Sequence, residues 1–484
     1  MRLSRRNLFK LLGPALALFI CAFTDLDPVN PKVTYMAALT VWMCVWWFSE
    51  AVSLAVTALV PVLMLPLLGI SEVKQVAQQY TDSIIFLFIG GFMLAFAIEK
   101  WNLHKRIAFR ILTLVGTKAS TILFGMMLTS FLISNWISNT ATTVMLFSAV
   151  YALIHETRDY IEKHSGKFAA AMLLGLAFSA TIGGMATPVG TPPNMYFFKA
   201  FHEAFPEKEL NFVTWSAIGF PLSFTFLLCC YFILNLYFIQ GKVKLKMNAG
   251  YFKEELRKLG PMSYEERTVF GISILAILLW LTRADINFES FQYKGWNHLF
   301  PYPNYFDDSL VALMAALALF LIPSTQDKGK SLLEWEDAKK IRYDIILMFG
   351  SGFALAYGFE KSGLSHWLAG SLQVFKAVSP FLLILGICVV VTIISEFASN
   401  IASIQLVIPI MLALHKELEV DPLLLMMPAT FAASLGFMLP VATAANTIVF
   451  GTKEIEMRDM LRVGIVLDTI GILLISTWCY FYLA

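Results

Sequence analysis

The hydrophobic pattern of the chain is a series of long apolar runs separated by short polar segments. Nine of these runs have the length, about 17 to 25 residues, that crosses a hydrocarbon core of roughly 30 Å. Each is therefore expected to form one membrane-spanning helix. They are residues 8–24, 32–49, 52–70, 83–100, 215–240, 267–283, 307–323, 343–359 and 462–483.

Four further apolar regions carry Ser, Asn, Gly, Pro or Thr at their middles: 119–152, 168–205, 378–414 and 422–452. A helix broken at membrane depth leaves N–H and C=O groups unpaired, which is tolerated where protein, water or a ligand satisfies them. We expect the first and third regions to form re-entrant hairpins, which enter and leave the membrane on one side. We expect the second and fourth to be spans that are broken in the middle.

The composition agrees with a membrane protein of many spans, for which the lipid bilayer is the surrounding partner. Hydrophobic residues make up 58% of the 484 residues and charged residues 14%, too few to cover a soluble globule of this size. The six cysteines lie in apolar segments without metal-ligand spacing, which favours a packing role. A positive-inside bias explains the formal net charge of +2 without a nucleic-acid partner.

Lysine and arginine cluster in three polar segments, at 100–118, 242–258 and 328–342. If the hairpins do not count as crossings, the chain has eleven spans, and a cytoplasmic N-terminus places all three segments inside. The C-terminus, just past Tyr482, would then lie outside. Short loops and the absence of a transit peptide favour a bacterial inner (plasma) membrane.

Some segments at the ends of spans allow two interpretations. The first apolar run follows several basic residues, as a signal peptide would, but no small-residue cleavage site precedes Asp25, and a first span is expected. Segments 101–116, 241–258 and 361–376 mix basic and apolar residues at helical spacing. They could lie flat at the membrane interface or be ordinary amphipathic loops.

Two short polar motifs each occur twice in this apolar sequence. Residues 138–140, Ser-Asn-Thr, return 261 residues later as Ser-Asn-Ile at 399–401. Residues 188–194, Pro-Val-Gly-Thr-Pro-Pro-Asn, match Pro-Val-Ala-Thr-Ala-Ala-Asn at 440–446, an offset of 252. Two halves built alike around broken helices are typical of secondary transporters.

The polar tip of each predicted hairpin could bind an ion. Exposed carbonyl groups favour a cation, and the positive N-terminal ends of half-helices favour an anion. The alternative is that small residues allow close helix packing while Ser and Thr bond back to the preceding turn. Packing is the simpler explanation of a single motif, but two copies with partner motifs favour binding.

The run at 187–194 holds three prolines and a glycine, which cannot form a continuous helix. A plain loop is the alternative interpretation. Against it, no charged residue lies between Lys167 and Lys199, a stretch longer than one membrane thickness.

Glu396 and Asp468 are charged residues inside apolar sequence, and such residues are candidates for function. Either could carry a coupled proton. Glu396 could instead orient the hairpin backbone, and Asp468 could pair across helices. The seven histidines avoid the centres of the spans, which argues against a histidine relay.

These motifs resemble those of the divalent anion/sodium symporter (DASS) family, the INDY-like carriers of di- and tricarboxylates, and the resemblance covers nearly the whole chain. Its specific parts are the two hairpin tips, the break at 187–194, the Ser-Glu-Ala run at 49–51 and the Phe-Leu-Phe-Ile-Gly-Gly-Phe-Met-Leu-Ala run from Phe86. The resemblance implies an all-α polytopic membrane protein with inverted repeats, eleven transmembrane helices and two re-entrant hairpins. It also implies a homodimer, an elevator-like movement and Na⁺ as the coupling ion.

The resemblance further implies a division into scaffold and transport domains. Residues 1–118 would form scaffold helices one to four with an interfacial helix, and 259–377 scaffold helices seven to nine. Residues 119–258 would form the first half of the transport domain, with a hairpin, broken span five and span six. Residues 378–484 would form its second half, with a hairpin, broken span ten and span eleven.

Carried over position by position, the resemblance assigns two sodium sites and one substrate site. The first sodium site would use Ser134, Ser138, Asn139 and Gly190, and the second Ser395, Ala398, Asn400 and Ala442. The anion would meet Ser138, Asn139, Thr140, Thr191 and Pro192 from one half and Ser399, Asn400, Ile401, Thr443 and Ala444 from the other. Hydroxyl, amide and main-chain oxygens suit a hard cation without a buried negative charge.

The second half departs from the family pattern in both of its motifs. Ile401 stands where the pattern has threonine, and Ala444 and Ala445 stand where it has two prolines. A hydrogen bond to a charged group contributes about 1.5 to 3 kcal/mol. One end of a dicarboxylate would therefore be held differently, through Ser403 or a backbone N–H.

The sequence thus predicts a sodium-coupled symporter of C4-dicarboxylates such as succinate, malate or fumarate. A sodium-independent dicarboxylate exchanger and a carrier of citrate or sulfate are alternatives within the same fold. An enzyme is not expected, because the chain has no His-Glu-x-x-His, paired-aspartate or phosphate-binding glycine motif. A passive channel is the remaining rival, and it would give currents without saturation or uphill accumulation.

Overall fold

Helices make up most of the described chain in the computed structural model, which describes residues 5–157, 161, 165–208, 210–240, 243, 250–288, 291–371 and 378–483. The first elements are α1 (Arg5–Phe23), α2 (Lys32–Ser49), α3 (Leu54–Thr57), α4 (Val60–Leu67), α5 (Val73–Gln78), α6 (Ser83–Lys100) and α7 (Leu103–Val115). They are followed by α8 (Ala119–Ser134), α9 (Asn139–Thr157), α10 (Ser165–Gly184), α11 (Pro192–Ala204), α12 (Phe212–Leu234), the π-helix η2 (Asn235–Ile239) and α13 (Tyr251–Lys258).

The second part of the chain repeats this order of long and broken helices. It begins with α14 (Tyr264–Thr282), strands β1 (Ile286–Phe288) and β2 (Phe291–Tyr293), the 3₁₀ turns η3 (Trp296–Leu299) and η4 (Pro303–Tyr305), α15 (Asp308–Leu321), α16 (Trp335–Ala338), α17 (Tyr343–Ser362) and α18 (Leu364–Ser371). It ends with α19 (Pro380–Phe397), α20 (Asn400–Leu418), α21 (Pro422–Ala432), α22 (Ala444–Phe450) and α23 (Met457–Leu483).

Most of the predicted spans coincide with helices. The runs predicted at 32–49 and 83–100 have the same bounds as α2 and α6. By length and composition, seven helices among the described residues could cross a membrane, namely α1, α6, α10, α12, α19, α20 and α23. In this count α6 includes the adjoining α5, and α12 includes the adjoining η2. The N-terminal run forms α1, which packs along α2, and the Trp46 side chain donates from Nε1 to Lys10 O at 3.2 Å.

One predicted span is interrupted. The single helix expected over 52–70 is wrong, because α3 ends at Thr57 and α4 begins at Val60. Pro61 lies in the first turn of α4, where its missing N–H costs nothing, whereas in a continuous helix it would leave Thr57 O unpaired. The sequence stays apolar through the break, so hydropathy does not reveal it.

The three predicted amphipathic segments are helical where they are described. Segment 101–116 forms α7, while α13 and α18 form parts of 241–258 and 361–376. Residues 241–242, 244–249 and 372–376 of those two segments lie outside the described residues.

Each predicted hairpin is a helix, a tight turn and a second helix that packs against the first. α8 turns into α9, and α19 turns into α20. The Ser138 hydroxyl accepts from Ala141 N at 3.4 Å, and the Ser399 hydroxyl accepts from Ala402 N at 3.3 Å. The same serine cap, at positions related by the repeat, therefore begins the second helix of both hairpins.

The two predicted broken spans are each a pair of helices joined by a non-helical segment that contains turns. α10 and α11 are separated by residues 185–191, and α21 and α22 by residues 433–443. α11 begins with Pro192 and Pro193, whereas α22 has no proline at its start. In α22 the Thr443 hydroxyl accepts from Asn446 N at 3.0 Å instead, so the two halves start the equivalent helix by different means.

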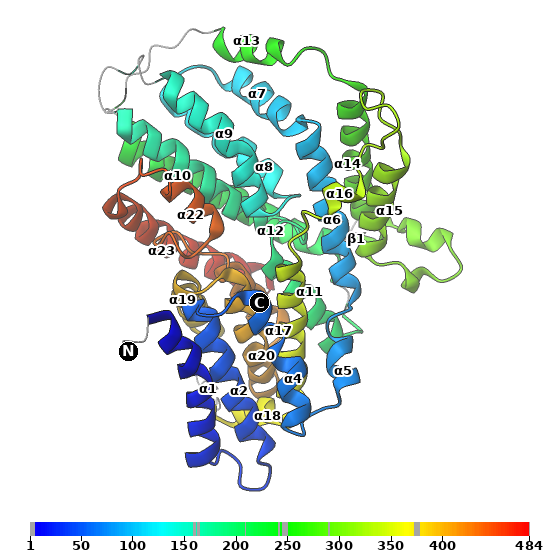
Figure 1. Cartoon of the computed structure of the whole chain (residues 1–484), viewed down its shortest axis with the longest axis vertical. Coiled ribbons are helices and arrows are strands. Elements are labelled where there is room, and N and C mark those ends of the chain that lie inside the picture. Colours follow the sequence, from blue (N-terminus) through cyan, green and yellow to red (C-terminus); the bar gives the residue numbers. More distant parts are fainter. Residues whose placement is uncertain are drawn as a thin grey trace.

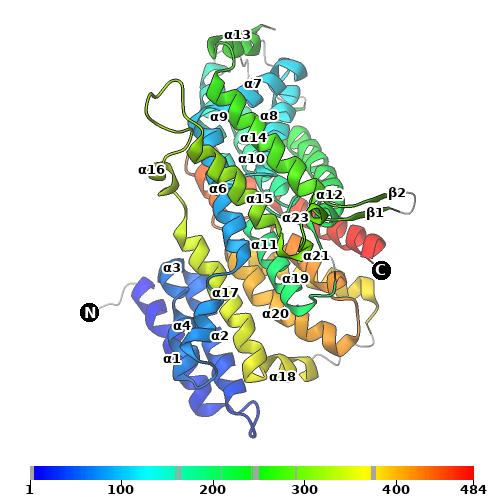
Figure 2. The same cartoon turned by 90° about the vertical axis from the view of Figure 1, so that its right-hand side faces the viewer.

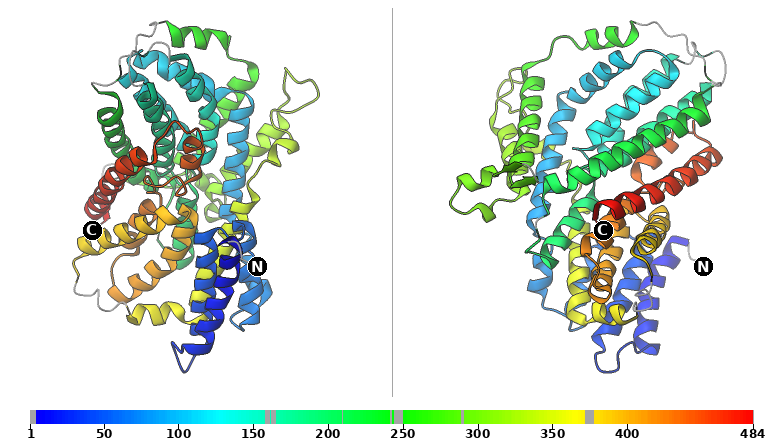
Figure 3. Two further views of the ribbon diagram at one scale, coloured as in Figure 1. Left: turned by 60° about the vertical axis from the view of Figure 1, so that its left-hand side comes forward. Right: turned by 180° about the vertical axis from the view of Figure 1, so that it is seen from behind.

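The two halves interleave. α22 packs against α9 and α10 of the first half, while α11 packs against α20 and α21 of the second. Figure 1 shows α8, α9, α10, α22 and α23 in the upper part of the molecule and α1, α2, α4, α18 and α20 in the lower part, and Figure 3 shows the same division from behind. α10 is buried along nearly its whole length, so it lies among other helices rather than at the surface.

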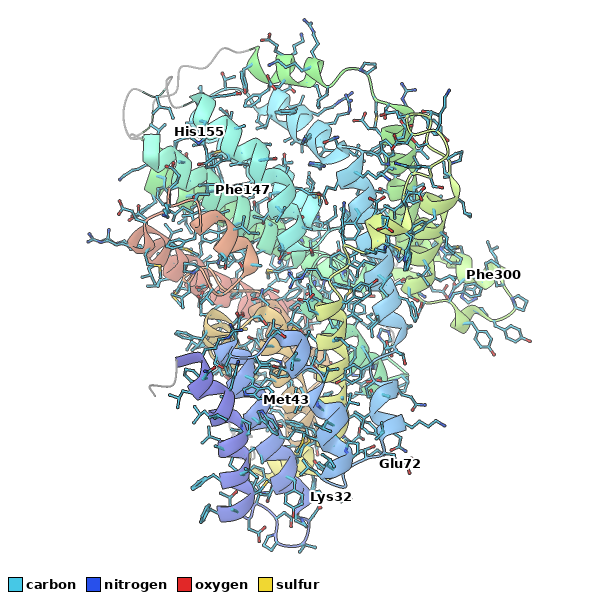
Figure 4. All side chains as sticks on the ribbon, in the orientation of Figure 1. Lys32, Met43, Glu72, Phe147, His155 and Phe300 are labelled. Carbon is cyan, nitrogen blue, oxygen red and sulfur yellow. The ribbon has the colours of Figure 1, made fainter. Side chains whose placement is uncertain are left out.

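The core consists of a large and a small hydrophobic cluster. The large one joins α6, α8 to α12 and α19 to α23. The small one joins α2, α4 and α17 to the tip of the second hairpin, where Ala398 and Ala402 are buried. Met43, labelled in Figure 4, is a fully buried member of the small cluster.

A two-stranded antiparallel sheet departs from the all-α prediction. β1 and β2 pair Ile286 with Tyr293 and Phe288 with Phe291. Figure 2 shows this hairpin projecting from the body beyond α14 and α15. It is a small addition to a loop, and the described elements are otherwise helical.

Candidate functional site

The turn of the first hairpin meets the end of α10 through a serine hydroxyl. Ser134, buried at the end of α8, places Oγ 3.0 Å from Asn139 Oδ1, 2.6 Å from Ala180 O and 3.4 Å from Ile137 O. One hydroxyl proton can serve one of these three oxygens. Oxygen atoms gathered in this way around a single point are what a small hard cation requires.

Gly190 lies against the same group of oxygens. A Cβ placed on Gly190 would come 2.6 Å from Gly184 O and 2.9 Å from Ser134 O, so a larger residue would need the backbone to move. Asn139 Nδ2 donates to Thr191 Oγ1 at 3.4 Å. The structure thus brings together Ser134, Asn139 and Gly190, three residues assigned to the first sodium site.

The second half repeats this arrangement. Ser395 Oγ lies 3.0 Å from Asn400 Oδ1 and donates to Ala433 O at 2.7 Å. A Cβ on Gly436 would lie 3.1 Å from Ala442 Cβ and 3.8 Å from Ser395 O. Three residues assigned to the second sodium site, Ser395, Asn400 and Ala442, therefore lie around one point as well.

The remaining two residues assigned to sodium, Ser138 and Ala398, lie in the hairpin turns themselves. In the part of the chain that the structure describes, no three His, Cys, Asp or Glu side chains group in a way that could hold a metal ion. The residues assigned to sodium offer neutral oxygens only, from serine hydroxyls, asparagine amides and the main chain.

The two halves fasten the hairpin to the break with opposite hydrogen-bond polarity. In the first half the Thr187 hydroxyl donates to the main-chain oxygen of Asn135. In the second half the repeat-equivalent of Asn135 is Glu396, whose carboxylate accepts from Met438 N at 2.9 Å and Leu439 N at 3.0 Å. Of the two roles predicted for Glu396, orienting the backbone matches these contacts.

Asp468 of α23, the second carboxyl group predicted to be functional, is also buried, and neither of its carboxylate oxygens has a hydrogen-bond partner among the described residues. The pairing across helices that we expected for Asp468 therefore stays a prediction. Coupling to a proton stays a prediction as well.

The tip of the first hairpin faces α6. Ser138, Asn139 and Thr140 are half-buried, and Ser138 lines a narrow gap between the tip and α6. Thr191 is buried behind the tip, and Pro192 is half-buried. These five residues, assigned to the anion, lie within one junction.

The tip of the second hairpin faces a different group of helices. Ile401 is half-buried and packs against the small cluster of α2, α4 and α17. The Ser403 hydroxyl, a predicted substitute for the missing threonine, is buried and donates to Ser399 O at 3.1 Å within its own helix. Ser403 or a backbone N–H as the substitute for the threonine hydroxyl stays a prediction.

The other residues assigned to the anion in this half are accessible. Ser399, Asn400 and Thr443 are half-buried, and Ala444 is exposed. Among the described residues no hydrogen bond joins the two hairpin tips. The single anion site between them therefore stays a prediction.

The buried lysine Lys199, which lies on α11, was not among the predicted site residues. Lys199 Nζ lies 3.5 Å from Asp82 Oδ2, 3.4 Å from Glu203 Oε1 and 3.8 Å from the centre of the Phe353 ring on α17. One turn earlier, Tyr196 stacks on Phe353 and donates to a carbonyl of α17 at 3.0 Å. A lysine at the end of a long uncharged stretch was the available sequence signal.

Comparisons with known proteins agree over nearly the full length. The family model described as the sodium:sulfate symporter transmembrane region matches residues 6–483. A protein of Staphylococcus saprophyticus named sodium-dependent dicarboxylate transporter SdcS is 35% identical over 482 residues, which cover 97% of this chain and 90% of the relative. The protein of the same name from Staphylococcus aureus strain NCTC 8325 is 35% identical over 480 residues, with the same two coverages.

Two solved structures share the fold at low sequence identity. MtrF of Neisseria gonorrhoeae aligns with a TM-score of 0.55 at 10% identity, over 84% of this chain and 82% of that chain. The YdaH transporter of Alcanivorax borkumensis aligns with a TM-score of 0.52 at 12% identity, over 98% and 96%. At these identities the likeness concerns the fold alone.

Proposed function

We propose that this chain, which belongs to the sodium:sulfate symporter family of multi-pass membrane transporters, is a sodium-coupled symporter of C4-dicarboxylates. It is a member of a transporter family and not an enzyme. The relatives at 35% identity support dicarboxylate and sodium as the transported pair. The observation that carries the proposal is the junction of hairpin and broken helix, lined with oxygen atoms and present twice.

In the proposed mechanism each junction holds one sodium ion. The two halves share one pair of side-chain ligands, Ser134 with Asn139 in the first and Ser395 with Asn400 in the second, while Ser138 of the first half has no hydroxyl counterpart in Ala398. Main-chain oxygens of the turns and breaks complete the shell, and Na⁺ supplies the positive charge there. Neutral oxygens suit a coupling ion that must also leave, because a full carboxylate ligand would hold it more tightly.

The dicarboxylate would lie between the two tips. Four helices begin at the junctions, namely α9, α11, α20 and α22, and the N-terminal end of a helix carries a partial positive charge that favours an anion. No lysine or arginine lies in either motif. The helix ends and the two sodium ions would therefore offset the charge of the substrate, which makes substrate binding depend on sodium.

The finer architecture is also part of the proposal. It comprises eleven spans with the two hairpins re-entrant, a cytoplasmic N-terminus, an external C-terminus and a homodimer. The scaffold would consist of 1–118 and 259–377, and 119–258 with 378–484 would move as an elevator. The aromatic and cation–π contacts of α11 with α17 support such a division, because they lie where a transport half meets a scaffold helix.

The test is uptake of labelled succinate into liposomes that contain the purified protein, with an inward sodium gradient and a potassium gradient as control. Accumulation above equilibrium that requires sodium is the expected result. Uptake that ignores sodium but rises with internal dicarboxylate would make the protein an exchanger. Competition by citrate or sulfate but not by malate or fumarate would make citrate or sulfate the substrate in place of a C4-dicarboxylate. Absence of saturation would indicate a channel.

A further inference from the structure

An asparagine in the first break has one half of its amide group in use and the other half unpaired. Asn194 is fully buried in the first turn of α11. Its Nδ2 donates to Gly184 O at 3.0 Å and to Thr187 O at 2.8 Å. Its Oδ1 is buried and meets no hydrogen-bond donor among the described residues.

The second break contains the same arrangement at the repeat-equivalent position. Asn446 is fully buried, and its Nδ2 donates to Gly436 O at 2.8 Å and to Leu439 O at 3.2 Å. Its Oδ1 is likewise buried without a donor in the described part of the chain. Both asparagines thus bind the carbonyls ten and seven residues before them and leave the amide oxygen free.

The orientation of these amides follows from their contacts. A rotation by 180° would point Oδ1 at two carbonyl oxygens and lose both hydrogen bonds, so the nitrogen must face the carbonyls. An unpaired buried acceptor is unfavourable, because it has lost its hydrogen bonds to water and gained none in the protein. An accident of packing at one site would not be expected again in the other half, where the surrounding side chains differ.

Both amides lie at the predicted sodium sites. Gly184, whose carbonyl Asn194 binds, is in contact with Gly190 and with Asn139. Gly436, whose carbonyl Asn446 binds, is close to Ala442 and Ser395. Carbonyl and amide oxygens outnumber the donors at each junction, and the serine hydroxyls there already donate to carbonyl groups, so a bound cation would satisfy a further acceptor.

We propose that Asn194 and Asn446 are additional sodium ligands, each contributing its Oδ1 to the ion of its own junction while its amide nitrogen holds two carbonyls of the break in place. This inference rests on the proposed function, because it requires sodium at the junctions. It explains why both breaks carry an asparagine three residues after the shared threonine, although the residues between them differ.

The experiment measures thermal unfolding of the purified protein without substrate, in sodium chloride titrated against choline chloride at constant ionic strength. The wild type is expected to be stabilised by sodium with a measurable half-saturating concentration. Asn194→Ala and Asn446→Ala should each raise that concentration about tenfold or more, because a lost bond to a charged group changes affinity by at least that factor. The KM for succinate at saturating sodium should change much less.

Asn235→Ala is the matched control. Asn235, at the start of η2, also has a buried Oδ1 without a donor among the described residues, but it lies outside both junctions. Its substitution should leave the half-saturating sodium concentration unchanged. If either junction variant does not fold, Asn194→Ser and Asn446→Ser keep a hydroxyl that can donate to one carbonyl and too short a side chain to replace Oδ1.

Two outcomes distinguish a failure of this inference from a failure of the proposed function. If wild type and junction variants show the same half-saturating sodium concentration, and the variants lose equal stability in sodium and in choline, the asparagines are structural clamps and the inference is refuted. If sodium does not stabilise the wild type and succinate uptake ignores sodium, the proposed function fails and the inference fails with it.

Discussion

Substitution of Glu396 by alanine tests whether one buried carboxylate holds the second hairpin to its broken helix. Glu396 is fully buried and accepts from Met438 N and Leu439 N. In Glu396→Ala both N–H groups lose their partner, and each unpaired buried donor is unfavourable by about 1 to 3 kcal/mol. The expected loss in the free energy of unfolding is therefore about 2 to 6 kcal/mol.

The equivalent joint of the first half provides the comparison. Thr187→Val leaves a single acceptor, Asn135 O, without its partner, so we expect roughly half the loss seen in Glu396→Ala. Glu396→Gln keeps one acceptor oxygen for one of the two N–H groups and should lose less than Glu396→Ala. Glu396→Ala, which leaves two groups unpaired, is therefore expected to lose the most of the three variants.

The assay is reversible unfolding in mixed micelles by increasing amounts of sodium dodecyl sulfate, followed by the fluorescence of the 11 tryptophans. The ratio of the losses matters more than their absolute size. The reasoning is refuted if Glu396→Ala stays within about 0.5 kcal/mol of the wild type, the range of ordinary surface changes. It is equally refuted if Thr187→Val loses more than Glu396→Ala.

Three further predictions test the site and its surroundings. Asn139→Ala or Asn400→Ala should abolish sodium-dependent succinate uptake while gel filtration still shows folded protein, and normal uptake by both would reject the site. Gly190→Ala should abolish sodium stabilisation in thermal unfolding because a Cβ there meets two carbonyl oxygens, whereas Gly386→Ala, with open space, should match the wild type. Lys199→Met should slow uptake at unchanged sodium affinity, because loss of the ammonium group leaves two carboxylates and the Phe353 ring without their partner. A changed sodium affinity would contradict this prediction.

The spans could be predicted from the sequence because a helix in lipid must be apolar along its whole length. α6 begins at Ser83 and ends at Lys100, where the hydropathy changes, so pattern and structure coincide. The break before Pro61 could not be predicted in the same way, because a proline in the first turn of a second helix leaves the pattern apolar. The strand pair after α14 follows no long period and was missed for that reason.

The repeat predicted which residues meet, but not how they bond. The offset of 261 makes Ser395 the equivalent of Ser134 and Asn400 the equivalent of Asn139. In each half the serine hydroxyl lies 3.0 Å from the amide oxygen of the asparagine. The repeat did not reveal that Glu396 would accept from backbone N–H groups, since this depends on which way the break turns. Nor did it assign a role to Asn194, whose free oxygen becomes apparent only when its nitrogen is placed.

The two halves differ in both sets of assigned residues, and the change in hydrogen-bonding groups is clearest on the anion side. In the sodium sets Ser134 and Asn139 pair with Ser395 and Asn400, whereas Ser138 and Gly190 stand against Ala398 and Ala442. In the substrate set Thr140 pairs with Ile401 and Pro192 with Ala444. Ile401 packs on the small apolar cluster, so its end of the site lacks a hydroxyl and lies against helices outside the proposed transport halves. Two similar sodium ions would then accompany one anion whose two carboxylates meet different surroundings. On this reasoning the ions set the driving force equally in both halves, and the choice among dicarboxylates depends on the unequal tips.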